Sequence, residues 1–221
     1  MAEHTLRGGV GSWAEAALDV KRSRFVCRIV RVETESDARD VIDAARKTQW
    51  NARHHCSAFV LGSNSQPDQV RRSNDDGEPS GTAGRPILDV LNGRNLIDCV
   101  AVVSRYFGGT LLGTGGLIRA YSDATAAAIE NAVASKGLVL RERRQLFRLS
   151  LPHSAAGRVE AELRQHGVVV LGTEYEASAV MMIASTPDGE PELAALVAGA
   201  TAGERMLEPA GIEWVDAQLD A

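Results

Sequence analysis

The sequence predicts a mixed α/β (α+β) protein built from two parts. Apolar residues recur with the period of strands in several short segments, and with the period of helices in segments between them. The chain has 221 residues, of which 44% are apolar and 24% are charged, so it is long enough for one large or two small globular cores. Only 5% of the residues are aromatic, so these cores depend on Val, Leu, Ile and Ala.

The N-terminal part begins with a loose lead and then alternates strands with helices. Thr34 or Ser36 is placed to cap the first helix, and Pro86 opens the second helix, which Asn92 and Gly93 end. The continuous apolar run over residues 96–104 indicates a strand that is buried on both faces. The expected elements are the lead over 1–13, strands within 15–32, 54–61, 70–73 and 96–104, the helix that carries Ala38, Val41, Ile42 and Ala45 on one face, the helix after Pro86, and a long helix over 117–134.

The C-terminal part has the element order β-α-β-β-α-β, which is that of a ferredoxin-like split unit. The expected elements are strands at 146–151, 168–173, 177–184 and 205–214, and helices from His153 to His166 and over 188–200. A cluster of arginines, Arg141, Arg143 and Arg144, lies between the two parts. We therefore expect one domain over residues 1–142 and a second over residues 143–221.

Charge is divided unevenly between the two parts. Residues 1–143 contain 19 Lys and Arg against 17 Asp and Glu, a net charge of +2, whereas residues 144–221 contain 5 against 12, a net charge of −7. The total of −5 argues against attraction of nucleic acid to the whole surface, although it leaves room for a local basic patch. A nucleic acid would prefer the N-terminal part.

Cysteine usage and the N-terminus indicate a cytoplasmic protein. Cys27, Cys56 and Cys99 are odd in number, lie in apolar stretches and lack zinc-site spacing, so we expect reduced and buried thiols. The N-terminus lacks the apolar segment of a signal peptide, and no apolar run approaches the ~20 residues of a membrane span. We expect no membrane partner.

The segment over residues 104–121 is the strongest functional signal. Five glycines lie within nine residues, namely Gly108, Gly109, Gly113, Gly115 and Gly116, between an apolar strand and a helix. Such a loop can bring backbone N–H groups to an anion, and the helix N-terminus adds donors and its positive dipole end. Arg105 and Arg119 flank the loop. No Gly-Lys-Ser/Thr follows, so it is not a Walker loop. The alternative is that the glycines only form a tight turn.

A second irregular loop spans residues 74–85. Its acids Asp75, Asp76 and Glu78 carry oxygen ligands that could bind a divalent cation. Acids in loops more often form Asx-turns and helix caps, which is the interpretation we favour. We therefore predict no metal site. Ser80 and Thr82 either donate to a phosphate or hold the loop together. The candidate anion site includes Asp76, Ser80, Gly81 and Thr82.

The sequence His54-His55-Cys56 raises the question of a nucleophile. On a strand, His54 and Cys56 lie on the same face, but side chains at i and i+2 are badly placed for the direct hydrogen bond that a catalytic Cys–His pair needs. We therefore favour the interpretation that Cys56 is a small buried thiol. His55 points to the other face and remains a candidate contact for a phosphate or a base. No catalytic set and no cofactor motif stands out, so we predict neither.

These motifs resemble those of the Impact family, also called the YigZ family, in its bacterial two-domain form. The resemblance covers residues 20–134 and is carried by four segments, Ser23-Arg24-Phe25, residues 55–58, residues 74–86 and residues 105–121. It implies an N-terminal sandwich like domain two of ribosomal protein S-five. It also implies a C-terminal domain like the last domain of elongation factor G. Many members carry a lysine where this chain has Leu111, which weakens the phosphate argument at that position.

The function expected from the residues and the resemblance is non-enzymatic regulation of translation. Eukaryotic members of the family regulate translation initiation, but they use a further domain, so we do not transfer their mechanism. The expected partner is RNA, the ribosome or a translation factor, bound through the glycine loops. Two alternatives stay open: an enzyme that acts on a small phosphorylated substrate, with His55 and Asp76 as acid–base candidates, or a protein-only adaptor.

Overall fold

The computed structural model describes residues 3–64, 66–186 and 188–217. Over these residues the chain forms ten strands and five helices, which confirms the mixed α/β class. The chain divides into two compact units. The first runs to Leu140 and the second is Arg141–Ala217, so the division lies close to the one expected after residue 142.

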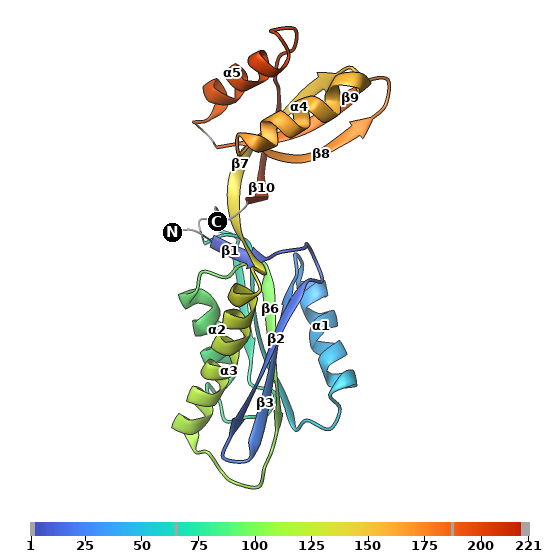
Figure 1. Cartoon of the computed structure of the whole chain (residues 1–221). Helices are drawn as coiled ribbons and strands as arrows, with labels where there is room; N and C mark the ends of the chain where they lie inside the picture. Colours follow the sequence, from blue (N-terminus) through green and yellow to red (C-terminus); the bar gives the residue numbers. More distant parts are fainter. Residues whose placement is uncertain (1–2, 65, 187, 218–221) are drawn as a thin grey trace. The chain divides into compact units, whose positions relative to one another are not determined.

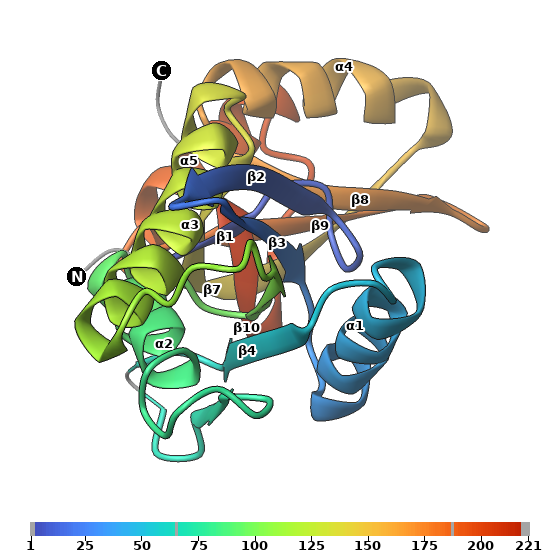
Figure 2. The ribbon, with the colours of Figure 1, turned by 90° about the horizontal axis from the view of Figure 1, so that it is seen from below.

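The first unit is a five-stranded antiparallel sheet between helices. The strand order is β2-β3-β6-β4-β5, and Figures 1 and 2 show α1 on one face of the sheet and α2 and α3 on the other. The elements are β1 (Glu3–Leu6), β2 (Trp13–Val20), β3 (Ser23–Arg31), α1 (Glu35–Thr48), β4 (His54–Leu61), β5 (Val70–Asn74), α2 (Gly84–Gly93), β6 (Cys99–Tyr106) and α3 (Thr114–Ala134).

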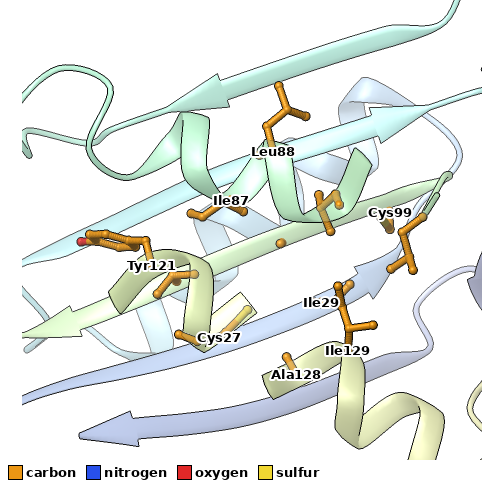
Figure 3. Packing of buried hydrophobic residues seen from close by; sticks show 14 of the residues in the cluster. Cys27, Ile29, Ile87, Leu88, Cys99, Tyr121, Ala128 and Ile129 are labelled. Carbon is orange, nitrogen blue, oxygen red and sulfur yellow. The ribbon is translucent and has the colours of Figure 1, made fainter. Parts of the chain in front are cut away.

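Each face of this sheet has its own core. Facing α2 and α3, the buried cluster includes Cys27, Ile29, Ile87, Tyr121 and Ile129, which Figure 3 shows packed together. Facing α1, a smaller cluster includes Ala38, Phe59 and Val100. The three cysteines are free and buried, as expected for reduced thiols.

The start of α1 shows why the chain turns helical at this point. Thr34 is the N-cap: its Oγ1 accepts from the Asp37 N–H at 3.1 Å, and the Asp37 carboxylate accepts from the Thr34 N–H at 3.0 Å. This reciprocal pair satisfies two amides that the helix leaves without partners. Of the two expected caps, the structure selects Thr34.

The second unit has the ferredoxin-like order β7-α4-β8-β9-α5-β10. Its strands lie in the order β10-β7-β9-β8, and both helices pack on one core with Phe147, Leu149 and Met181. This confirms the predicted topology. The elements are β7 (Leu138–Leu151), α4 (His153–Gln165), β8 (Val169–Tyr175), β9 (Ala179–Ser185), α5 (Glu190–Ala200) and β10 (Glu208–Ala217).

Two expectations about the ends of elements are wrong. Residues 1–13 are not a loose lead, because Glu3–Leu6 forms β1, which neighbours β7, and β2 already begins at Trp13. The strand expected at 146–151 begins at Leu138. A four-residue strand is too short to show a period, and the charged residues of the first half of β7 hide its alternation.

Candidate anion-binding site

The two loops singled out in the sequence line one cleft in the first unit. The loop after β5 contributes Gly77, Glu78 and Pro79, and the segment after β6 contributes Phe107, Leu111, Leu112, Gly113 and Thr114. The cleft has a volume of about 390 Å³, and Arg53, His54 and Arg105 also line it. The tertiary fold therefore brings together two motifs that are separated in the sequence.

A second cleft, of about 440 Å³, lies between α1 and the β4–β5 edge of the sheet. Its two arginines on α1 are already paired, because Arg39 meets Glu35 at 3.0 Å and Arg46 meets Asp76 at 2.9 Å. Arg72, on β5, also lines this cleft and donates only to the carbonyl of Arg71, at 3.3 Å, so one arginine of the three has no acidic partner among the described residues.

The loop before α2 is organised around the carboxylate of Asp75. This carboxylate accepts N–H bonds from Gly81 at 2.8 Å, from Ala83 at 3.0 Å and from Gly84 at 2.8 Å. Burial alone would raise the pKa of Asp75, but these three N–H groups hold it below its usual range. The amides of Ala83 and Gly84 at the start of α2, and that of Gly81 in the loop before it, are therefore occupied by an anion from the same chain.

The hydroxyl residues of this loop differ in their surroundings. Thr82 is buried, and its Oγ1 donates to the carbonyl of Pro79 at 2.6 Å, so it holds the turn. Ser80 is exposed. Of the two functions left open by the sequence, the structure shows Thr82 in the one that holds the loop together.

Asp76 joins the loop to α1 and β4. Its Oδ1 accepts from Arg46 at 2.9 Å, and its Oδ2 accepts from the backbone N–H of His55 at 2.6 Å. Burial by itself would raise the pKa of Asp76, whereas the His55 N–H and the Arg46 guanidinium lower it below the usual range. Both oxygens of this carboxylate thus have partners.

The two histidines lie on opposite faces of β4. His54 lines the cleft, and its Nδ1 lies 2.8 Å from the carbonyl oxygen of Asp76. His55 shares the α1 face with Phe59; its ring is buried, with Nδ1 2.9 Å from Ser104 Oγ. Burial lowers the pKa of His55. The candidate His55 therefore does not line the cleft, and its neighbour does.

Arg105 lies beneath the cleft in a buried network. It is 5% exposed, and its Nη1 donates to Glu78 Oε1 at 2.6 Å. The hydroxyl of Tyr121 donates to the same oxygen at 2.8 Å, and burial raises the pKa of Tyr121. Arg105 Nε is buried and has no hydrogen-bond partner among the described residues. The positive charge of Arg105 is thus largely compensated by Glu78.

The glycine loop after β6 has two kinds of glycine. A Cβ on Gly108 would lie 1.9 Å from the carbonyl oxygen of Arg22, so only glycine fits this close approach between the loop and the β2–β3 hairpin. Gly109 and Gly113 have φ values of +84° and +73°, and no atom lies within 4 Å of a Cβ built on either. Gly115 is equally uncrowded. The loop thus combines one packed glycine with others whose backbone is accessible.

The N-terminus of α3 is open. Gly113 is the N-cap and provides no side chain, and the Leu117 N–H makes the first helical bond, to the Gly113 carbonyl at 2.9 Å. The amides of Thr114, Gly115 and Gly116 come before that bond, and no described side chain caps them. The start of α3 therefore offers donors that the start of α2 does not.

Exposed cations gather at this end of the first unit. We call them the basic cluster, which comprises Lys21, Arg22, Arg24, Arg53 and Arg119. None of these five side chains has a hydrogen bond or an ion pair within residues 3–64, 66–186 and 188–217. The hairpin with Lys21 and Arg22 and the loop before α3 lie together at the lower end of the unit (Figure 1).

Arg119 is the one member of the basic cluster that the sequence analysis placed in the site; Lys21, Arg22, Arg24 and Arg53 were missed. Arg53 follows α1 in a stretch without a motif, but its backbone N–H donates to the carbonyl of Arg105 at 2.8 Å, and this bond brings Arg53 to the cleft. Its guanidinium lies 5.6 Å from the ring centroid of Phe107. The residues Lys21 to Arg24 carried a visible signal, because three of the four are basic.

The described residues contain no group of three or more His, Cys, Asp and Glu side chains arranged to hold a metal ion. Among the helices of the described ranges, none is both long enough and apolar enough to cross a membrane.

The fold and the two loops define a two-domain protein of Impact type. A sequence profile of the Impact N-terminal domain matches residues 21–129, and that of a domain of unknown function, DUF1949, matches residues 149–204. The chain is 44% identical over 161 residues to the IMPACT family member YvyE of Bacillus subtilis, covering 73% of this chain and 71% of that protein. The chain belongs to the IMPACT family.

Two further comparisons extend the likeness over both units. The IMPACT family member YigZ of Escherichia coli is 32% identical over 189 residues, which cover 86% of this chain and 90% of that one. A crystal structure described as that of a hypothetical protein superposes with a TM-score of 0.56 at 28% identity, covering 93% of this chain and 96% of the other. The family likeness therefore includes the C-terminal unit.

Proposed function

We propose that this protein is a non-enzymatic, cytoplasmic regulator of translation that binds RNA, free or within the translation machinery. The observation that carries the proposal is the uncapped N-terminus of α3 beside the basic cluster. Amides at a helix N-terminus bind phosphate oxygens, and nearby cations strengthen that binding. The proposed contacts are the amides of Gly109, Gly115 and Gly116 and the guanidinium groups of Arg53 and Arg119.

The charge distribution supports a local binding surface. The chain carries a net charge of −5, so a polyanion is repelled by the protein as a whole and attracted only where cations lack acidic partners. Arg39, Arg46 and Arg85 have acidic partners, whereas the basic cluster has none among the described residues. Arg105 supports the cleft wall and contributes little free charge, because Glu78 pairs with it.

Family membership supports the translational part of the proposal, because the eukaryotic relatives that the motifs resemble regulate translation initiation. The enzyme alternative receives no comparable support. Both Asp76 oxygens are engaged, and the His55 ring is buried on the face opposite the cleft. General acid–base catalysis requires an acid and a base that both face the substrate. His55 and Asp76 do not meet this requirement at the cleft.

The test is RNA binding measured by fluorescence anisotropy with a labelled single-stranded RNA over a range of salt concentrations. We expect affinity to fall steeply with salt and to fall further in an Arg53→Gln/Arg119→Gln variant. The matched control is Arg39→Gln/Arg94→Gln, which removes the same charge from cations that are paired with Glu35 and Glu130.

Each outcome is decisive for the proposal. Loss of affinity in the Arg53/Arg119 variant but not in the control supports it. Equal loss in both variants shows that net charge alone governs binding and contradicts the site. Absence of binding to RNA and to ribosomes in cosedimentation contradicts the function. Partner binding that survives the Arg53/Arg119 change indicates the protein-only adaptor.

A further inference from the structure

The connection between β2 and β3 is a two-residue turn with an unusual composition. Val20 pairs with Ser23, so the turn consists of Lys21 and Arg22 alone. Both residues have positive φ, +44° for Lys21 and +71° for Arg22. Positive φ at both central residues is the property of a type I′ turn, which matches the twist of the flanking strands.

Lysine and arginine are poor residues for this turn. Positive φ brings Cβ into contact with the backbone, and for this reason Asn-Gly is the preferred sequence at these two positions. Lys21 and Arg22 are exposed, and neither side chain has a hydrogen bond or ion pair in the described parts of the chain. Among the described residues, the two side chains therefore make no polar contact that would offset the cost of the strained backbone.

The turn is packed against the glycine loop. Gly108 approaches the Arg22 carbonyl so closely that a Cβ on Gly108 would lie 1.9 Å from its oxygen. The Gly108 N–H also donates to Ser23 Oγ at 3.3 Å. The two cations therefore extend from a turn that is held directly beside the loop leading into α3.

From the strain, the exposure and this packing, we infer that Lys21 and Arg22 bind the phosphodiester backbone of a single RNA strand. The inference rests on the proposed function, and it assigns the strained turn to the binding surface. In this arrangement the two cations of the turn contact successive phosphates of the strand. Strained backbone positions cluster at functional sites, and this turn carries two of them side by side.

The inference predicts opposite effects on stability and on binding. In Lys21→Asn/Arg22→Gly, relief of strain raises the melting temperature of the full chain by about 3–8 °C. Loss of two phosphate contacts lowers the affinity for single-stranded RNA about tenfold, and it makes the slope of log K against log salt shallower by about 1.4. In Lys21→Gln/Arg22→Gln the affinity falls in the same way, but the melting temperature does not rise.

The matched control is Lys136→Gly/Arg94→Gln. Lys136 also has positive φ, +53°, and it follows the C-terminal end of α3, whereas the site lies at its N-terminal end. This variant relieves backbone strain at one residue and, like the test variant, removes two positive charges, but at positions away from the proposed surface. We expect it to raise the melting temperature, or leave it unchanged, and to bind RNA like the wild type.

The measurements separate the inference from the function on which it rests. Wild-type affinity and salt slope in the Asn-Gly variant, beside a wild type that binds RNA, would overturn the inference alone. No increase in melting temperature in that variant would overturn the argument from strain. A wild type that does not bind RNA overturns the proposed function and the inference with it.

Discussion

The carboxylate of Glu78 lies 2.6 Å from the guanidinium of Arg105, and both side chains are buried. Glu78 comes from the loop before α2, whereas Arg105 lies near the end of β6. The Tyr121 hydroxyl, from α3, donates to the same carboxylate oxygen at 2.8 Å. One carboxylate thus joins a loop, a strand and a helix beneath the cleft, and with Asp75 and Asp76 it holds the loop in place.

Glu78→Gln should destabilise the protein strongly. The substitution leaves the Arg105 charge buried without a counter-charge, so we expect the free energy of unfolding to fall by about 3–5 kcal/mol. Urea denaturation followed by circular dichroism measures the change. Glu130→Gln, which breaks an exposed pair with Arg94, is the control and should cost less than about 1 kcal/mol. Similar small losses in both variants would contradict a buried, coupled pair.

The stability of the protein should fall in acid partly through Asp75 and Asp76. The pKa of each is lower in the folded protein than its ordinary value. Such a carboxylate stabilises the fold above the unfolded pKa of about 3.9, and this stabilisation is lost as the pH falls through the folded pKa. The Asp75→Asn/Asp76→Asn variant should have a lower free energy of unfolding than the wild type at neutral pH. Between neutral pH and about pH 3, that free energy should decline less in the variant than in the wild type. Parallel curves for variant and wild type would be inconsistent with this linkage.

Two glycines of the same loop and helix start should respond in opposite ways to alanine. In Gly108→Ala the new Cβ collides with the Arg22 carbonyl, so we expect a loss of about 1–3 kcal/mol in the free energy of unfolding. In Gly115→Ala the Cβ meets nothing within 4 Å, so alanine should be neutral or stabilise α3 by about 0.4–1 kcal/mol. Chemical denaturation of the two variants tests the pair, and equal effects would show that the approach of Gly108 to Arg22 is not tight.

The three thiols should be unreactive in the native protein. Burial raises the pKa of Cys27 and of Cys56 to about 12, and burial also raises that of Cys99. Since the thiolate is the reactive form, a disulfide reagent at about pH 8 should modify none of the three until the protein is denatured. Rapid modification of a native thiol, located by mass spectrometry, would show that the fold opens at that position.

Local sequence patterns predicted much of the fold because they arise from neighbours along the chain. The Thr34 cap, the helix opened by Pro86 and the buried strand near residues 96–104 each depend on side chains within one or two turns. β1 escaped prediction because its four residues are identified only by a partner that lies more than a hundred residues later in the chain.

The sequence by itself determined the class of fold, the ferredoxin-like order of the C-terminal unit and the two loops that form the candidate site, because periodicity, glycine and proline act locally. Only the tertiary structure decided which charges are free. The register between β4 and β6 places His54 opposite Arg105, and the loop before α2 brings Glu78 to the same place, so Arg105 is neutralised. The packing of Gly108 on the β2–β3 turn places Lys21 and Arg22 beside the loop that leads into α3. Such pairings join distant segments, and their free energy depends on burial and geometry that no local pattern encodes.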